Sequence, residues 1–117
     1  MTTQQENYIE SQLEAYREEL ESKDADYIED KVQDALEEAE EKERERIDDL
    51  NAQEKLSLHG AAYEAHIQKF LKDKDKELHD YFKAECDKEN DRLVNEYREK
   101  LESEVEKYKS QQDNVRN

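Results

Sequence analysis

Three histidines and one cysteine are the side chains of this 117-residue chain that most often bind metals or act as nucleophiles. His59 and His66 lie seven residues apart and can share one face of a helix, with His79 further along. No His-Glu-x-x-His or Glu-x-x-His pattern surrounds them, so we expect no metal site. Cys86 stands in a charged helical segment without a pocket-forming sequence, and we interpret it as a packing residue.

Catalysis by phosphate loops or by carboxylates is also not expected. The chain contains one glycine and no proline, which excludes the glycine-rich loops that hold nucleotide phosphates. Its 35 acidic residues could act in acid–base catalysis only if some were buried in a cleft with shifted pKa values. A thin helical protein offers no such cleft, so the sequence predicts neither an enzyme nor a cofactor.

The acidic residues are concentrated in the first half of the chain. Residues 1–58 contain 20 acidic and 7 basic residues, whereas residues 59–117 contain 15 and 12. Residues 24–49 alone contain 13 acidic residues and 4 basic ones. A surface of this sign repels nucleic acid and anionic membranes and attracts basic protein surfaces. The alternative is that these side chains form only a solvated face that keeps the protein in solution.

We predict that this acidic segment binds a basic surface of a protein partner, including surfaces that otherwise bind nucleic acid. Tyr27 is the candidate aromatic anchor, because tyrosine is favoured at interfaces and acidic residues surround it. The other tyrosines are expected mainly along the apolar seam of the helices. The candidate partner-binding residues are Asp24, Asp26, Tyr27, Glu29, Asp30, Asp34, Glu37, Glu38, Glu40, Glu41, Glu45, Asp48 and Asp49.

Small size, negative charge and helicity together resemble a class of proteins, the acidic DNA-mimic inhibitors with which phages block host nucleic-acid-binding proteins. No shared motif accompanies this resemblance. It implies an inhibitor or regulator without catalytic activity that covers a basic surface of its partner.

Helices must position these side chains, because the apolar residues recur at helical spacing and most other positions hold good helix formers. Ile9, Leu13, Tyr16 and Leu20 follow the 4-3-4 spacing of a heptad seam. A second series continues from Ile28 with a shifted phase, and a third runs from residue 63 to 108. Residues 40–46 contain no apolar side chain, so we expect this stretch to be solvated.

The fold class predicted is all-α: a long antiparallel helical hairpin or coiled coil of two to three helices in a single domain, residues 1–117. Its first arm covers about residues 4–55, its turn about 56–61 and its second arm about 62–109, with a frayed polar tail at 110–117. The turn is placed at Gly60, the single glycine. The repeated segments 16–22 and 97–103 are symmetric about residues 59 and 60, which favours this position and would pair Leu50 with Phe70.

Alternatives to this hairpin are a helix that continues through Gly60 and a short third helix near residues 51–60, which Asn51 would cap. The seam could also be buried by self-association into a homodimer or larger bundle, which would make the protein a structural or scaffolding coiled coil. Neither a transmembrane segment nor a secretory signal is expected, and the predicted compartment is the cytoplasm.

Overall fold

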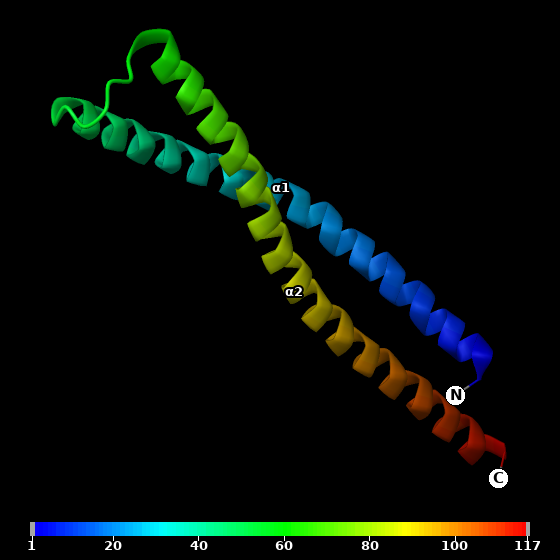
Figure 1. Ribbon diagram of the computed structural model, residues 1–117. Helices are drawn as coiled ribbons and strands as arrows, with labels where there is room; N and C mark the ends of the chain where they lie inside the picture. The colour runs from blue at the N-terminus through cyan, green and yellow to red at the C-terminus, as the bar shows by residue number, and fades with distance from the viewer. Residues whose placement is uncertain (1, 117) are drawn as a thin grey trace. The chain divides into compact units, whose positions relative to one another are not determined.

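The computed structural model describes residues 2–116, and side chains as far as Tyr108. Helix α1 (Thr3–Ala52) and helix α2 (Gly60–Arg116) are joined by residues 53–59 (Figure 1). The described residues contain no strand and no third helix, and the helices pack antiparallel, which confirms the predicted all-α hairpin. No described helix is long and apolar enough to cross a membrane.

The structure divides into two compact helix pairs, each described below by itself. The terminal unit combines the chain up to Asp24 with the chain from Glu85 onward, and the loop unit comprises Ala25–Ala84. Helix α2 extends to Arg116, so its backbone is helical over most of the tail that the sequence predicts to fray. The side chains of that tail, and residue 117, lie outside the described part of the chain.

The terminal unit is built on a small apolar core. Ile9 and Leu13 of α1 are buried with Val94 and Leu101 of α2, and partly buried tyrosine, leucine and valine side chains pack around them. The rings of Tyr16 and Tyr97 lie 4.8 Å apart between centroids and are tilted by 52°. These tyrosines begin the two repeated segments, so the repeat does place equivalent residues against each other. Thr2 and Gln5 form a capping box at the start of α1.

The loop unit has a thinner seam with a charged residue in it. In α1 the seam residues are Ile28, Val32, Leu36, Ala39, Glu43, Ile47 and Leu50, all buried or half-buried. Glu43 is only 8% exposed, although residues 40–46 were expected to be solvated. The expectation is wrong at Glu43 because the seam passes from Ala39 through Glu43 to Ile47 in two steps of four residues, so helical spacing places this carboxylate on the face toward α2.

The chain reverses at residues 53–59, earlier than the predicted 56–61, because α1 ends in a Schellman motif. The amide of Lys55 donates to the carbonyl of Leu50, and the amide of Glu54 donates to that of Asn51. Glu54 occupies the left-handed position of this motif, with a φ of 59°. Gly60, which also has a φ of 59°, is the first residue of α2 and does not lie at the centre of the turn.

Asn51 has a different role from the predicted helix cap. Its side chain lies in the last turn of α1, where Nδ2 donates to the carbonyl of Leu58 at 2.8 Å and Oδ1 accepts from the Leu58 amide at 3.0 Å. The register of the helices also differs from the prediction, because the turn is centred before Gly60. Phe70 lies beside Ala35 and Ala39, so the predicted pairing of Leu50 with Phe70 is wrong.

Candidate functional site

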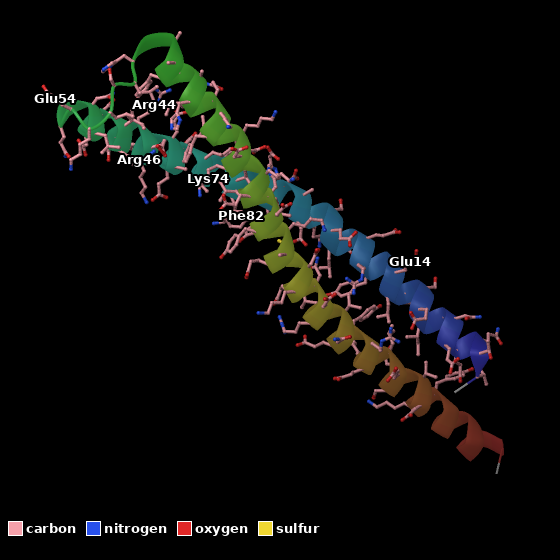
Figure 2. All side chains as sticks on the ribbon, viewed as in Figure 1. Glu14, Arg44, Arg46, Glu54, Lys74 and Phe82 are labelled. Atoms are coloured by element: carbon pink, nitrogen blue, oxygen red, sulfur yellow. The ribbon has the colours of Figure 1, made fainter. Side chains whose placement is uncertain are left out.

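A single row of carboxylates follows the outward face of α1 in the loop unit. Each member stands two residues before a seam residue, which at 3.6 residues per turn places it on the side of the helix opposite α2. All of these side chains are exposed. This acidic stripe consists of Asp26, Asp30, Asp34, Glu37, Glu41, Glu45 and Asp48. Figure 2 shows the side chains that project from α1 along this segment.

The basic residues of the same helix segment are occupied elsewhere. Lys42 Nζ pairs with Glu38 at 2.8 Å, and Arg46 Nε donates to Glu43 at 2.8 Å. Arg44 makes a two-pronged contact across to Glu64 of α2, at 3.0 and 3.2 Å, and Lys31 lies over the ring of Tyr27. Within the described residues, no hydrogen bond or ion pair to a base is formed by any side chain of the acidic stripe.

The other predicted binding residues lie away from this stripe. Asp24 belongs to the terminal unit, where it is half-buried and its Oδ2 accepts from Asn90 Nδ2 at 2.7 Å. Glu29 lies 3.4 Å from His79 of α2. Glu40 is half-buried and pairs with Arg44 at 3.5 Å, and Glu38 pairs with Lys42. The remaining acid, Asp49, is exposed in the last turn of α1.

Tyr27 is 50% exposed, but the cation of Lys31 lies 5.6 Å from the centre of its ring. Around the circumference of α1, Tyr27 lies on one flank, which also carries Lys31 and Glu38. The acidic stripe is centred on the neighbouring part of the circumference, which faces away from α2. Three of the seven tyrosines, Tyr16, Tyr63 and Tyr97, are half-buried along the helix contacts. The other four are exposed, so the seam holds fewer tyrosines than the sequence suggests.

Glu43 is a carboxylate that composition and charge alone do not distinguish from its neighbours. Its Oε1 accepts from Arg46 and lies 3.4 Å from His66 Nε2 of α2. Burial opposes ionisation of this group, but the hydrogen bonds from Arg46 and His66 together lower its pKa below the ordinary value of 4.5. Helical phase would have revealed it, since Glu43 lies four residues before the buried Ile47 and four after Ala39.

Hydrogen bonds to neighbouring side chains also shift the pKa values of other groups in the loop unit. The hydrogen bond from Lys42 lowers the pKa of the Glu38 carboxyl, and the bond from Arg44 lowers that of Glu64. His79 Nδ1 contacts the backbone carbonyl of Asp75 at 2.9 Å, and this contact together with Glu29 raises the pKa of the imidazole. These carboxylates are held ionised by bases, which is the opposite of what a general acid requires.

Cys86 is half-buried in the terminal unit. Burial raises the pKa of its thiol, and the neighbouring Asp24 and Asp87 carboxylates raise it further. Such a thiol is a poor nucleophile at neutral pH, in agreement with its interpretation as a packing residue. Among the residues described, no group of three histidine, cysteine or acidic side chains is arranged to hold a metal ion.

Comparison of the chain with protein-family models, with curated proteins and with solved structures finds no match.

Proposed function

We propose that this protein is a non-enzymatic binding protein whose acidic stripe occupies a basic surface of a protein partner. The observation that carries the proposal is that none of the seven stripe carboxylates forms a hydrogen bond or ion pair within the described residues, although Glu45 lies within the electrostatic reach of Lys42, while the four bases of the same helix segment are engaged with other side chains. A partner that supplies lysine or arginine side chains along this face would pair charges that the chain itself leaves without a counterpart.

The spacing of the stripe suits a partner surface that otherwise binds nucleic acid. From Asp26 to Asp48 the stripe extends about 33 Å, which gives one carboxylate per about 5 Å of helix axis. One strand of B-DNA presents a phosphate per about 3.4 Å of its axis. The two densities are of the same order, so an inhibitor or regulator that competes with nucleic acid is the form of the proposal that we favour.

The row of like charges in the acidic stripe lowers the stability of the folded chain. Like charges three or four residues apart destabilise a helix by about 0.2–0.5 kcal/mol per pair, and the stripe contains six successive pairs of this kind. The stripe therefore lowers helix stability by roughly 1–3 kcal/mol when no partner is bound. Binding of cations along the face would remove this repulsion, which adds to the affinity for a basic partner.

Removal of charge from the stripe tests the proposal. In the test variant Glu37, Glu41 and Glu45 are changed to glutamine, which keeps their size and helix propensity. The matched control changes Glu14, Glu18 and Glu21, which are exposed on one face of α1 in the terminal unit. Both variants lose three negative charges, so a difference in binding depends on position and not on net charge.

Capture from the native host with each variant as bait, followed by titration against the purified partner, gives the readout. We expect the stripe variant to bind at least about tenfold more weakly, the control to bind like the original protein, and affinity to fall steeply with salt. Double-stranded DNA is expected to compete for the same partner surface. Equal losses in the two variants, or binding that is indifferent to salt, would contradict the proposal.

A further inference from the structure

His79 connects the two helices of the loop unit by using both nitrogens of its ring. Nδ1 lies 2.9 Å from the backbone carbonyl oxygen of Asp75, one turn earlier in α2, and 3.3 Å from the carboxylate Oδ1 of the same residue. Nε2 lies 3.4 Å from Oε2 of Glu29 on α1. The imidazole is half-buried, and Glu29 is exposed. The two nitrogens of one ring therefore face oxygen atoms on different helices.

These contacts determine which nitrogen of His79 can lose its proton. A carbonyl oxygen only accepts hydrogen bonds, so Nδ1 must carry the proton that is donated to Asp75. A neutral imidazole holds one proton, which leaves Nε2 with a bare lone pair. That lone pair would face the carboxylate of Glu29, which is itself only an acceptor. The contact between His79 and Glu29 is therefore attractive only when both ring nitrogens are protonated.

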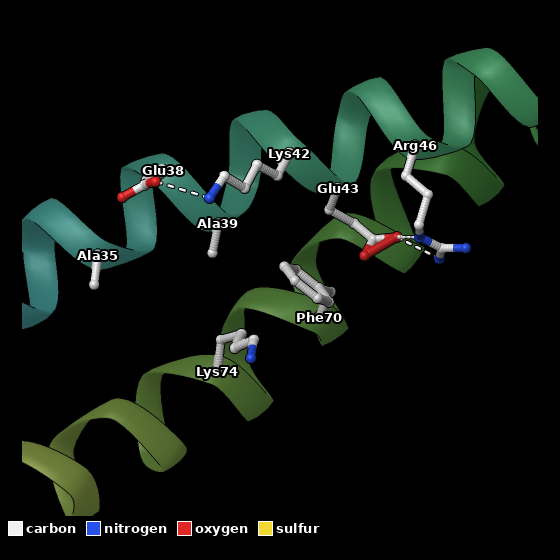
Figure 3. Close-up of a pocket in the computed structure, with 8 residues that line it drawn as sticks. All are labelled: Ala35, Glu38, Ala39, Lys42, Glu43, Arg46, Phe70 and Lys74. Carbon is white, nitrogen blue, oxygen red and sulfur yellow. Dashed lines mark hydrogen bonds and ion pairs between the residues drawn. The ribbon is translucent and has the colours of Figure 1, made fainter.

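The other histidine contact between these helices has a different geometry. His66 Nε2 lies 3.4 Å from Oε1 of the buried Glu43. The same carboxylate accepts from Arg46 of its own helix (Figure 3). Within the described residues, Nδ1 of His66 has no hydrogen-bond partner. A neutral His66 can therefore hold its proton on Nε2 and donate it to Glu43, so this contact does not require a charged ring.

We propose that His79 and Glu29 form a proton-dependent clasp between the helices of the loop unit, which closes with the imidazolium and opens when Nε2 loses its proton. Glu29 of α1 and Asp75 of α2 are the charged groups that face the ring. The hydrogen bond to the Asp75 carbonyl and the contact with Glu29 raise the pKa of His79 above its ordinary value of 6.5, so the clasp remains closed to a higher pH. The inference concerns the contact between the helices and does not depend on the proposed function.

Opening of the clasp affects one level of the loop unit and not the other. Water reaches both partners, since Glu29 is exposed and His79 is half-buried. Neither side chain is therefore held against the other once the attraction is lost. The contact between Glu43 and His66 persists at the same pH, because the neutral ring can still donate. A rise in pH is thus expected to loosen the helices around residues 29 and 79 more than around residues 43 and 66.

Nitrogen NMR of the histidine rings in the full chain tests the clasp. We expect neutral His79 to carry its proton on Nδ1 and neutral His66 to carry its proton on Nε2. Glu29→Gln removes a charge that favours the imidazolium, so the titration midpoint of His79 is expected to shift to lower pH. Glu37→Gln is the matched control, because it makes the same change at an exposed position about two turns further along α1. It is expected to shift that midpoint much less.

Hydrogen exchange of the original protein measures the effect on the helices. After correction for the intrinsic pH dependence of exchange, amide protection is expected to fall between about pH 6 and pH 9 by more around residues 29 and 79 than around residues 43 and 66. Circular dichroism checks that the helices persist at each pH and in both variants. The inference is overturned if neutral His79 carries its proton on Nε2, if Glu29→Gln and Glu37→Gln shift its midpoint equally, or if protection falls equally around the two contacts.

Discussion

At the scale of single residues, two side chains next to the turn determine how α1 ends. Asn51 closes the reversal by binding both the amide and the carbonyl of Leu58, in a connection that contains no glycine between residues 53 and 59. Glu54 accepts a left-handed backbone conformation that glycine adopts without steric penalty. One of these residues therefore stabilises the turn, while the other weakens it.

Substitution of Asn51 by alanine removes both hydrogen bonds to Leu58 and leaves a half-buried amide and carbonyl with fewer partners. We expect the free energy of unfolding to fall by about 1–3 kcal/mol, measured by urea denaturation followed by circular dichroism. Gln53→Ala, an exposed position two residues on, is the control and should change stability little. A similar small effect in both variants would show that the two hydrogen bonds between Asn51 and Leu58 do not contribute to stability in solution.

Glycine at position 54 should have the opposite effect. Glu54→Gly removes the contact between Cβ and the backbone in the left-handed conformation, and we expect a gain in stability of about 1 kcal/mol. The same substitution at Gln53, which lies at the helix end without a positive φ, is expected to destabilise the protein. Thermal denaturation of both variants tests this, and a lower melting temperature for Glu54→Gly would contradict it.

At the scale of the elements, the helices were predictable and their alignment was not. Apolar residues at helical spacing and the near absence of glycine and proline were sufficient to predict two long helices. Glycine is the usual signal of a reversal and therefore predicts the turn at Gly60, but the chain turns with Glu54 in the left-handed position, and Gly60 is the first residue of α2. A Schellman motif with glutamate at this position has no distinctive sequence signal. The predicted alignment of α1 with α2 therefore differs from the observed alignment.

The contact between α1 and α2 in the loop unit also predicts a dependence on pH. Asp75 and Glu29 raise the pKa of His79 above its ordinary value of 6.5. The folded state therefore binds this proton more tightly than the unfolded chain, and the stabilisation is complete below about pH 6.5. It is lost as the pH rises through the pKa of the folded state.

We therefore expect the urea midpoint of the original protein to fall between about pH 6 and pH 8 by more than that of His79→Gln, which cannot take up the proton. Comparison of the two proteins removes the contributions of other titrating groups. Parallel pH profiles would show that the contacts of His79 with Asp75 and Glu29 do not persist in solution.

At the scale of the whole molecule, the net charge of −16 opposes folding through self-repulsion. The candidate site illustrates what a sequence can predict here. Composition shows the excess of acidic residues in 24–49, but it does not show which of them lack a partner in the folded chain. Asp24 contacts Asn90. Three further acids contact bases, namely Glu29, Glu38 and Glu40, and seven others form the stripe. The partners of Asp24 and Glu29 come from the other helix and hence depend on the register, whereas Glu38 and Glu40 pair with bases four residues on in the same helix.

Salt should therefore stabilise this protein. Between about 0.02 and 0.3 M NaCl the range of electrostatic repulsion shrinks from about 20 Å to about 6 Å, so we expect the melting temperature to rise. The variant with glutamine at positions 37, 41 and 45 should have a higher melting temperature at low salt, and its melting temperature should rise less as salt is added. A melting temperature that falls with salt would mean that cross-helix pairs such as Arg44–Glu64 and Arg98–Glu10 outweigh the repulsion.

The carboxylate of Glu43 within the seam has a consequence for how the chain finds its native alignment. Two helices with aliphatic residues at such regular intervals could shift past each other by one helical turn and still bury much of their apolar surface. A slipped hairpin would separate Glu43 from His66, and in the terminal unit Asp24 from Asn90. Glu43 would keep its hydrogen bond from Arg46 of the same helix, but a buried polar group that loses one partner still costs about 1–3 kcal/mol, so we expect these contacts to disfavour the shifted alignments.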